Sequence, residues 1–316
     1  MVIVMKRFKA SYYGFLVGDA MGVPLKFEKR ENLLKNPVID MRGYGSYNVP
    51  VGSWSCNSSM MLATMDSISS KNRIDYDDMM TKYSEWISFS KYTSTGEVFD
   101  IGRTTLKAIS RYQEGYNSLE SGLEGVNDNG NGALMRMLPI AFYAHHLELE
   151  ENDIIDLVCR ASSLTHGHEI SKLGCYIFVR YVMFLLDGHD KEMSYHLIKM
   201  LNYSSFSMEA KNAYNRLLNG DIVGYPLDCI SSSGYVVDTL EAVIWCINNT
   251  DNFSQAVIGA INLGDDTDTI GALTGGIAGI IYGMDNIPKD WNNALQKKDY
   301  LKLMLTVFIK SFSKLG

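Results

Sequence analysis

Apolar residues recur every three or four positions along most of the chain, which is the spacing of one face of an α-helix. In segment 76–92, YDDMMTKYSEWISFSKY, this face carries Met79, Tyr83 and Trp86, and Asp75 is placed to cap the first turn. The same periodicity predicts helices over 100–115, 152–167, 168–188, 209–220 and 237–249. Convincing alternation with a period of two, the mark of strands, is missing. The pattern therefore predicts an all-α protein of about a dozen helices.

The organisation of the chain points to one domain. Hydrophobic residues make up 46% of the 316 positions, enough to bury a substantial core. No internal repeat, low-complexity tract or linker-like change of composition interrupts the sequence. We therefore expect residues 1–316 to form a single domain.

Charge and cysteine content exclude some functions. The formal net charge of −7 argues against nucleic-acid binding, which needs clustered Lys and Arg to neutralise phosphates. No stretch reaches about 18 consecutive apolar residues, so we expect no membrane span and no signal peptide. The five cysteines are odd in number and irregularly spaced, which is typical of reduced thiols. These features favour a cytoplasmic protein.

Most candidate functional residues lie in the connections between predicted helices. In GDAMGVPLKFE, residues 18–28, we expect the first helix to end near Gly18 and Asp19, before Gly22 and Pro24 turn the chain. Asp19 and Glu28 are candidate functional acids at this joint. Taken singly, an acidic loop residue more often bonds nearby backbone amides.

Two further joints offer polar groups to a ligand. Ser55 to Ser59, SCNSS, precede an apolar helix, and capping accounts for one or two of these side chains but not all five. The surplus can present amides and hydroxyls to an anion or a ligand oxygen. In NDNGNGALMR, Gly130 and Gly132 alternate with Asn129 and Asn131 ahead of another helix, and Arg136 follows one turn later. Such a turn suits a phosphate, although it is also a common connection.

The joint GDDTDT, residues 264–269, carries the strongest signal. Asp265, Asp266 and Asp268 stand at the first turn of an apolar helix, with no basic residue nearby in the sequence. One aspartate there is a cap, whereas three repel one another and call for a counter-ion. Clustered oxygen ligands suit Mg²⁺, Mn²⁺ or Ca²⁺. A metal site and an elaborate cap both remain open on this motif alone.

Taken in order, these motifs resemble the ADP-ribosylglycohydrolase family, which includes the dinitrogenase-reductase-activating glycohydrolases. The resemblance spans nearly the whole chain, through GDAMGVPLKFE, GSWS, IGRTT, NGNGALMRMLPIA, LTHGH, SGYVVDTLEAVIW and GDDTDTIGALTGGIAG. It implies a compact orthogonal bundle of helices, in agreement with the all-α pattern. It also implies a cleft holding two divalent ions, usually magnesium, over the ribose of an ADP-ribose group.

The resemblance assigns roles to particular residues. Asp266, Asp268 and Thr269 match metal ligands of the late motif, and Ser55 is expected as a further ligand. Glu28 matches an acidic residue beside the metals and is, with Asp266, the expected catalytic group. The expected ligand-binding residues are Asn129, Gly130, Asn131, Gly132, Ser55, Asn57 and His166, with the NGNG turn cradling phosphates. Without the resemblance, His166 is more typical of a helix cap or a core hydrogen bond.

One motif departs from the family pattern. The first ligand motif is typically Thr or Ser, Asp-Asp, then Thr or Ser, whereas this chain has Ser55-Cys56-Asn57-Ser58. A neutral amide and a soft thiol replace two carboxylates, so we expect Mg²⁺ (or Mn²⁺) with one position weakened. The first interpretation is a metal-assisted hydrolase that removes ADP-ribose from a modified side chain or small conjugate. The second is a module that binds ADP-ribose or an NAD-derived nucleotide without turnover, and the third is a silent structural relative.

A different class of activity would follow from a reactive Cys56. This thiol precedes an apolar helix, whose dipole favours a thiolate, and His166 or His168 could act as its base. Slow labelling of Cys56 by iodoacetamide would exclude this alternative. ADP-ribose or an ADP-ribosylated protein is the expected partner, with no nucleic acid and no membrane.

Overall fold

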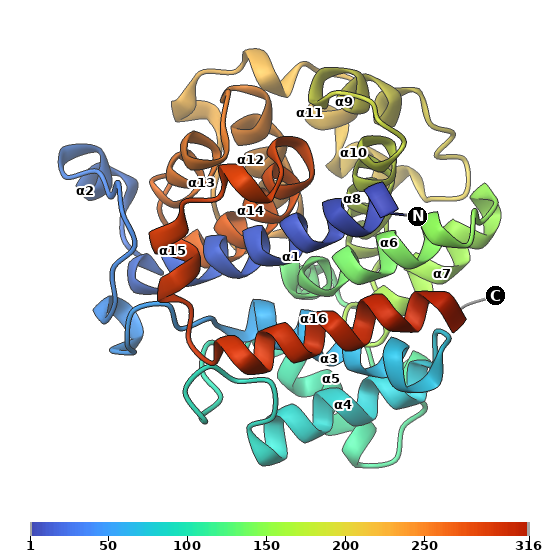
Figure 1. Ribbon diagram of the computed structural model, residues 1–316. Coiled ribbons are helices and arrows are strands. Elements are labelled where there is room, and N and C mark those ends of the chain that lie inside the picture. The colour runs from blue at the N-terminus through green and yellow to red at the C-terminus, as the bar shows by residue number, and fades with distance from the viewer. Residues whose placement is uncertain (1, 315–316) are drawn as a thin grey trace.

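The computed structural model describes residues 2–314, and within them the protein is built from helices without a β-sheet (Figure 1). The longer helices are α1 (Val2–Gly22), α3 (Cys56–Lys71), α4 (Tyr76–Phe89), α5 (Arg103–Gln113), α6 (Met137–His146), α7 (Glu151–Ser163), α8 (Glu169–Leu186), α9 (Lys191–Met200), α12 (Val236–Asn248), α13 (Phe253–Ile261), α14 (Thr267–Tyr282) and α16 (Lys298–Ser311). The shorter ones are α2 (Arg30–Lys35), α10 (Met208–Ala213), α11 (Asn215–Leu218) and α15 (Lys289–Ala294). The all-α prediction is confirmed.

Local sequence signals explain several helix boundaries. Asp75 caps α4 by accepting a hydrogen bond from the Asp78 amide, as its position predicts. Two other boundaries differ from expectation. Helix α1 continues past Asp19 to Gly22, and α5 begins at Arg103 rather than Asp100. Asp19 therefore lies within α1 and Asp100 lies before the first turn of α5, and the carboxylates of both contact buried side chains.

Helices α1 and α14 pack against each other through the centre of the molecule. Glycines on both make this possible, because a Cβ at Gly18 would lie 1.9 Å from the Gly271 carbonyl oxygen. A Cβ at Gly14 would lie 2.2 Å from the Gly275 carbonyl oxygen. The two backbones therefore touch directly, and the N-terminal end of α14 is held beside the C-terminal end of α1.

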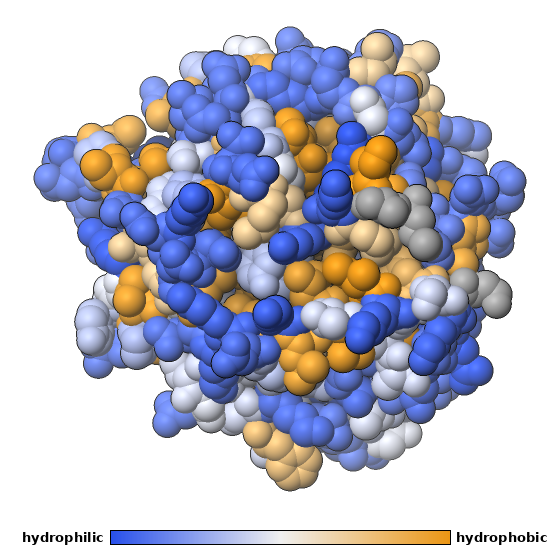
Figure 2. Space-filling model, viewed as in Figure 1, coloured by the Kyte–Doolittle hydropathy of each residue, from blue (hydrophilic) through white to orange (hydrophobic). Residues whose placement is uncertain are grey.

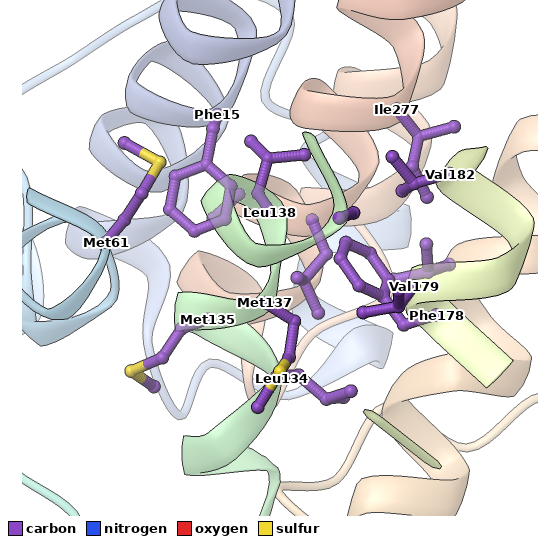
Figure 3. Close-up of a cluster of buried hydrophobic side chains, with 14 of the residues drawn as sticks. Phe15, Met61, Leu134, Met135, Met137, Leu138, Phe178, Val179, Val182 and Ile277 are labelled. Atoms are coloured by element: carbon purple, nitrogen blue, oxygen red, sulfur yellow. The ribbon is translucent and has the colours of Figure 1, made fainter. Parts of the chain in front are cut away.

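The apolar core surrounds this central pair. Figure 3 shows Phe15 of α1 and Ile277 of α14 in one cluster with Leu138 of α6 and Phe178 of α8. Met135, from the 3₁₀ helix η5 (Asn131–Arg136), lies at the edge of this cluster. Because η5 is anchored in the core, the NGNG turn (residues 129–132), whose last two residues begin η5, has a fixed position.

The outer surface is mostly polar on the face viewed in Figure 1. Figure 2 shows polar residues over most of that face, with apolar residues in separate smaller patches. Among residues 2–314, none of the helices combines the length and apolarity that crossing a bilayer requires.

Candidate functional site

A cavity of about 480 Å³ opens where the joints between helices converge. Its walls come from the segment after α1, the start of α3, the segment before α5, the NGNG turn, and the segments before α12 and α14. Lys26, Asp100, Asn131, His166, Gly234 and Asp266 are among the lining residues. Its size is that of a small-molecule site.

A buried lysine lies at the base of this cavity. The Lys26 ammonium donates to Asp266 Oδ1, lies 2.5 Å from Asp268 Oδ1 and lies 3.0 Å from Asp100 Oδ2. Its side chain is 9% exposed. Burial alone would lower the pKa of Lys26, but the three carboxylates outweigh burial and raise it well above the ordinary value. Lys26 is therefore a permanent cation at neutral pH.

Local structure explains how Lys26 reaches the carboxylates. Helix α1 ends at Gly22, and the 3₁₀ helix η1 (Val23–Leu25), with Pro24 in its first turn, reverses the chain. Asp100 has φ +56°, an unusual backbone for a non-glycine residue, and this turns its carboxylate toward Lys26. The Tyr47 hydroxyl donates to the other oxygen of Asp100.

Asp19 is fully buried beneath this group. Its carboxylate accepts hydrogen bonds from Ser55 Oγ at 2.7 Å, Ser58 Oγ at 2.5 Å and the Ser58 amide at 3.0 Å. Burial and the neighbouring Asp268 raise the pKa of Asp19, and these hydrogen bonds partly oppose the rise. Ser55 and Ser58, at the start of α3, thus bind an aspartate of α1 rather than an external ligand.

Asn57 connects two of the carboxylates. Its Nδ2 lies 3.1 Å from Asp268 Oδ2 and 3.4 Å from Asp19 Oδ1. Its Oδ1 accepts from Thr269 Oγ1 at 3.2 Å. The amide is therefore a neutral bridge between acidic groups of α1 and α14.

The GDDTDT motif forms a further part of the cavity wall through Asp265, Asp266 and Thr269. Asp266 is the residue before α14, and its Oδ1 also accepts from Thr269 Oγ1 at 3.0 Å. Burial raises the pKa values of Asp266 and Asp268, a neighbouring carboxylate raises each further, and the ion pairs with Lys26 only partly oppose the rise. Asp265 is different, since it is exposed at the cavity.

The NGNG turn contributes the Asn131 side chain and one close backbone approach, at Gly132. Asn131 Nδ2 donates to Asp266 Oδ2 and, at 2.8 Å, to Thr239 Oγ1. A Cβ at Gly132 would lie 2.7 Å from Thr105 Oγ1 and 2.9 Å from His166 Cε1, so glycine fits this position closely. Gly130 also lines the cavity, whereas the Asn129 side chain accepts from Ser171 of α8.

His166 faces the same cavity as a neutral imidazole. Its Nδ1 lies 2.7 Å from Thr165 Oγ1. Burial, with a contribution from Arg136, lowers the pKa of His166 to about 3. Arg136 itself donates to the carbonyls of Ala161 and Ser162 at 2.8 and 3.2 Å, so it does not reach an anion in the cavity.

Glu28 is not brought to this cluster. It is exposed, it does not line the cavity, and its carboxylate accepts from Asn32 Nδ2 at 3.2 Å. The chain after η1 directs Lys26, two positions earlier, into the interior instead. The other expected residues that the structure brings together are Ser55, Asn57, Gly130, Asn131, Gly132, His166, Asp266, Asp268 and Thr269.

Two residues at the centre of the site, Lys26 and Asp100, are not among those predicted from the sequence. Lys26 stands in a short apolar run, VPLKF. A lysine in such a run is a sign of burial, and a buried lysine needs a carboxylate partner, which Lys26 has. The sequence pattern places Asp100 at the start of the helix expected over 100–115, and its neighbours in the sequence do not distinguish it from a helix cap. Both reach the site through contacts that are distant in sequence.

The donor set around Lys26 does not fit a divalent cation. The carboxylate oxygens that would ligate it face the ammonium of Lys26, the amide of Asn57 or the amide of Asn131. The nearby Cys56 is a soft ligand that suits Mg²⁺ poorly. The magnesium site stays a prediction, and it requires these nitrogen donors to be displaced.

The arrangement does not support a reactive thiol. Cys56 is buried, and burial together with the negative charge of Asp100 raises the pKa of Cys56 well above its ordinary value. This outweighs the effect of the helix terminus. His168 caps α8 through its Nδ1, at 3.3 Å from the Ile170 amide, and does not line the cavity.

Comparison with known proteins decides the family. A family model described as ADP-ribosylglycohydrolase matches residues 2–313. The chain belongs to the ADP-ribosylglycohydrolase family. It is 32% identical to the ADP-ribosylarginine hydrolase Tri1 of Serratia proteamaculans (strain 568), over 93% of this chain and 76% of that protein.

Other relatives agree with this assignment. The ADP-ribosyl-[dinitrogen reductase] glycohydrolase of Rhodospirillum rubrum is 29% identical, over 93% of this chain and 92% of that protein. A solved structure described as an ADP-ribosylglycohydrolase-related protein complex superposes with a TM-score of 0.81 at 25% identity, covering 99% of this chain and 100% of that one. The resemblance seen in the sequence and the expected helical bundle are both confirmed.

Proposed function

We propose that the cavity binds the ADP-ribosyl group of a modified arginine and that the protein hydrolyses the bond between ribose C1 and the guanidinium nitrogen. The observation that carries this proposal is the position of Asp266 in the cavity wall, between Asn131 and Thr269. Membership of a family of ADP-ribosyl hydrolases supports it. The arginine linkage is supported by the similarity to the ADP-ribosylarginine hydrolase of Serratia proteamaculans.

The residues present suggest how the reaction proceeds. A water oxygen attacks ribose C1 while the bond from C1 to the arginine nitrogen breaks, Asp266 accepts the proton of the water, and the leaving guanidine takes a proton from solvent. The raised pKa of Asp266 makes it a better base than an exposed aspartate. Lys26, Thr269 and Asn131 hold the carboxylate in one orientation.

A second candidate is recognition of the ADP-ribosyl group without hydrolysis. The contact of the Lys26 ammonium with Asp266 Oδ1 favours it, because a close cation makes a carboxylate a weaker base. The cavity and the polar side chains that line it would then serve binding alone.

Release of ADP-ribose from an arginine-modified protein tests the proposal, with a serine-modified protein as the comparison substrate. Wild-type protein should release ADP-ribose from arginine. Asp266→Asn should reduce kcat by about 100-fold or more while free ADP-ribose still binds. Asp285→Asn makes the same chemical change at an exposed position outside the cavity and should leave kcat unchanged.

The outcomes separate the candidates. Binding of ADP-ribose without release from either substrate would replace hydrolysis by recognition. Neither binding nor release would overturn both.

A further inference from the structure

We infer that Lys26 is a built-in cation for this site, so that the protein binds ADP-ribose without a divalent metal. The inference rests on the proposed function for its ligand. It concerns a positioning role, because Lys26 acts by holding the carboxylates that form the wall of the cavity.

The first step is geometric. The Lys26 ammonium contacts carboxylates from two separate segments, Asp100 before α5 and the pair Asp266 and Asp268 at the start of α14. Holding carboxylates from different segments together is what a bound metal ion would normally do at such a site. Here the chain supplies that charge itself.

The second step is electrostatic. Asp266 and Asp268 are buried, and their negative charges could not remain adjacent without compensation. The Lys26 ammonium, in contact with both carboxylates and with Asp100, supplies that compensation. A divalent ion entering between the same oxygens would face this ammonium at contact distance, and displacing a lysine from three ion pairs opposes its binding.

The third step concerns the other side of Asp268. There the Asn57 Nδ2 bridges Asp268 and Asp19, at 3.1 and 3.4 Å. Both oxygens of Asp268 are therefore occupied by nitrogen donors from the chain, one charged and one neutral. Because Lys26 and Asn57 hold the two oxygens of Asp268, this carboxylate has no oxygen free to chelate a metal together with a neighbouring carboxylate.

Titration with metal alone tests the inference without relying on activity. Mn²⁺ is titrated into the metal-free full-length protein, with bound Mn²⁺ followed by electron paramagnetic resonance. Wild-type protein should bind Mn²⁺ with a Kd above about 1 mM, whereas Lys26→Gln should bind it at least tenfold more tightly. Lys29→Gln removes the same charge from an exposed position and should behave as wild type.

A second measurement keeps the test decisive if Lys26→Gln does not fold. Calorimetric titration of wild-type protein with ADP-ribose is run in EDTA and again with about 1 mM Mn²⁺, a concentration near the Kd expected for Mn²⁺ itself. The Kd should agree within about twofold between the two conditions.

Each result has a distinct meaning. Micromolar Mn²⁺ binding by wild type, no gain of affinity in folded Lys26→Gln, or loss of ADP-ribose binding in EDTA would overturn the role of Lys26 while leaving the proposed function intact. Absence of ADP-ribose binding in both conditions would instead overturn the proposed function, and the Mn²⁺ titration would still decide whether Lys26 excludes metal.

Discussion

Asn57 of α3 donates a hydrogen bond of 3.1 Å to Asp268 of α14 and thereby connects two helices whose sequences are more than 200 positions apart. The same amide reaches Asp19 of α1. An uncharged residue thus stands where buried carboxylates of two other helices converge.

Asn57→Asp should destabilise the protein at neutral pH. It places a third carboxylate against Asp19 and Asp268 and removes the amide donor, which should cost about 3 kcal/mol or more of unfolding free energy in EDTA. Saturating Mn²⁺ should restore part of the loss by binding the folded state. Urea unfolding with and without Mn²⁺ measures both effects, and equal stability of variant and wild type in EDTA would contradict the electrostatic account.

Gly18→Ala should disrupt the contact between α1 and α14. Its Cβ would lie 1.9 Å from the Gly271 carbonyl oxygen, a backbone atom that cannot rotate away, so we expect a loss of about 3 kcal/mol or more. Gly259→Ala in α13 is the matched control, because no atom lies within 4 Å of its Cβ. The control should be neutral or stabilising by up to about 1 kcal/mol in thermal or urea unfolding. Equal effects at the two positions would show that helix propensity, not contact, governs both.

The stability contributed by Glu241 should fall as pH rises. Burial raises the pKa of Glu241 to about 6 from an ordinary value of 4.5, despite Arg216 at 3.4 Å. The folded protein therefore holds this proton more tightly than the unfolded chain does. Its contribution is complete below pH 4.5 and is lost as pH rises through 6, by about 2 kcal/mol in total.

Glu241→Gln removes that titration. The difference in unfolding free energy between wild type and variant should therefore shift in favour of the variant between pH 4.5 and 7.5, by about 2 kcal/mol. Urea unfolding at several pH values gives the curve. A difference that does not change with pH would show that Glu241 titrates normally.

Iodoacetamide at neutral pH should modify Cys229 and leave Cys56 intact. Cys229 is exposed, whereas Cys56 is buried with a raised pKa and carries little reactive thiolate. Peptide mass spectrometry over a time course identifies the modified thiol, and Cys229→Ser should remove most of the fast labelling. Rapid labelling of Cys56 would revive thiol chemistry in the cavity.

Asp265→Asn should weaken the preference for an arginine linkage. Asp265 is exposed at the cavity, where its charge can attract a guanidinium, and exposed charges of this kind contribute about 1 kcal/mol. We expect kcat/KM for an arginine-modified substrate to fall by about fivefold to tenfold. The Kd for free ADP-ribose, which lacks the guanidinium, should stay within about twofold. Equal losses in both would place Asp265 in nucleotide binding instead.

The sequence indicated the helical class and most of the residues that converge on the cavity, because periodicity, caps and glycine turns are local signals. Asp266, Asp268, Asn131 and His166 could be named from motifs that keep their family order. Lys26 could not be placed, since its position depends on where α1 ends and on how the chain turns at η1. For the same reason the expected catalytic acid was Glu28, two residues further on, whose side chain lies on the surface.

The glycine contact between α1 and α14 joins residues 2–22 to residues 267–282, and 245 positions of chain separate Gly22 from Thr267. During synthesis on a ribosome, α1 emerges long before α14 and must wait with its apolar face uncovered, or covered by temporary partners. The acidic cluster is subject to the same delay, because Lys26 is translated some 240 residues ahead of Asp266. Assembly of the cavity therefore has to follow the emergence of α14 from the ribosome.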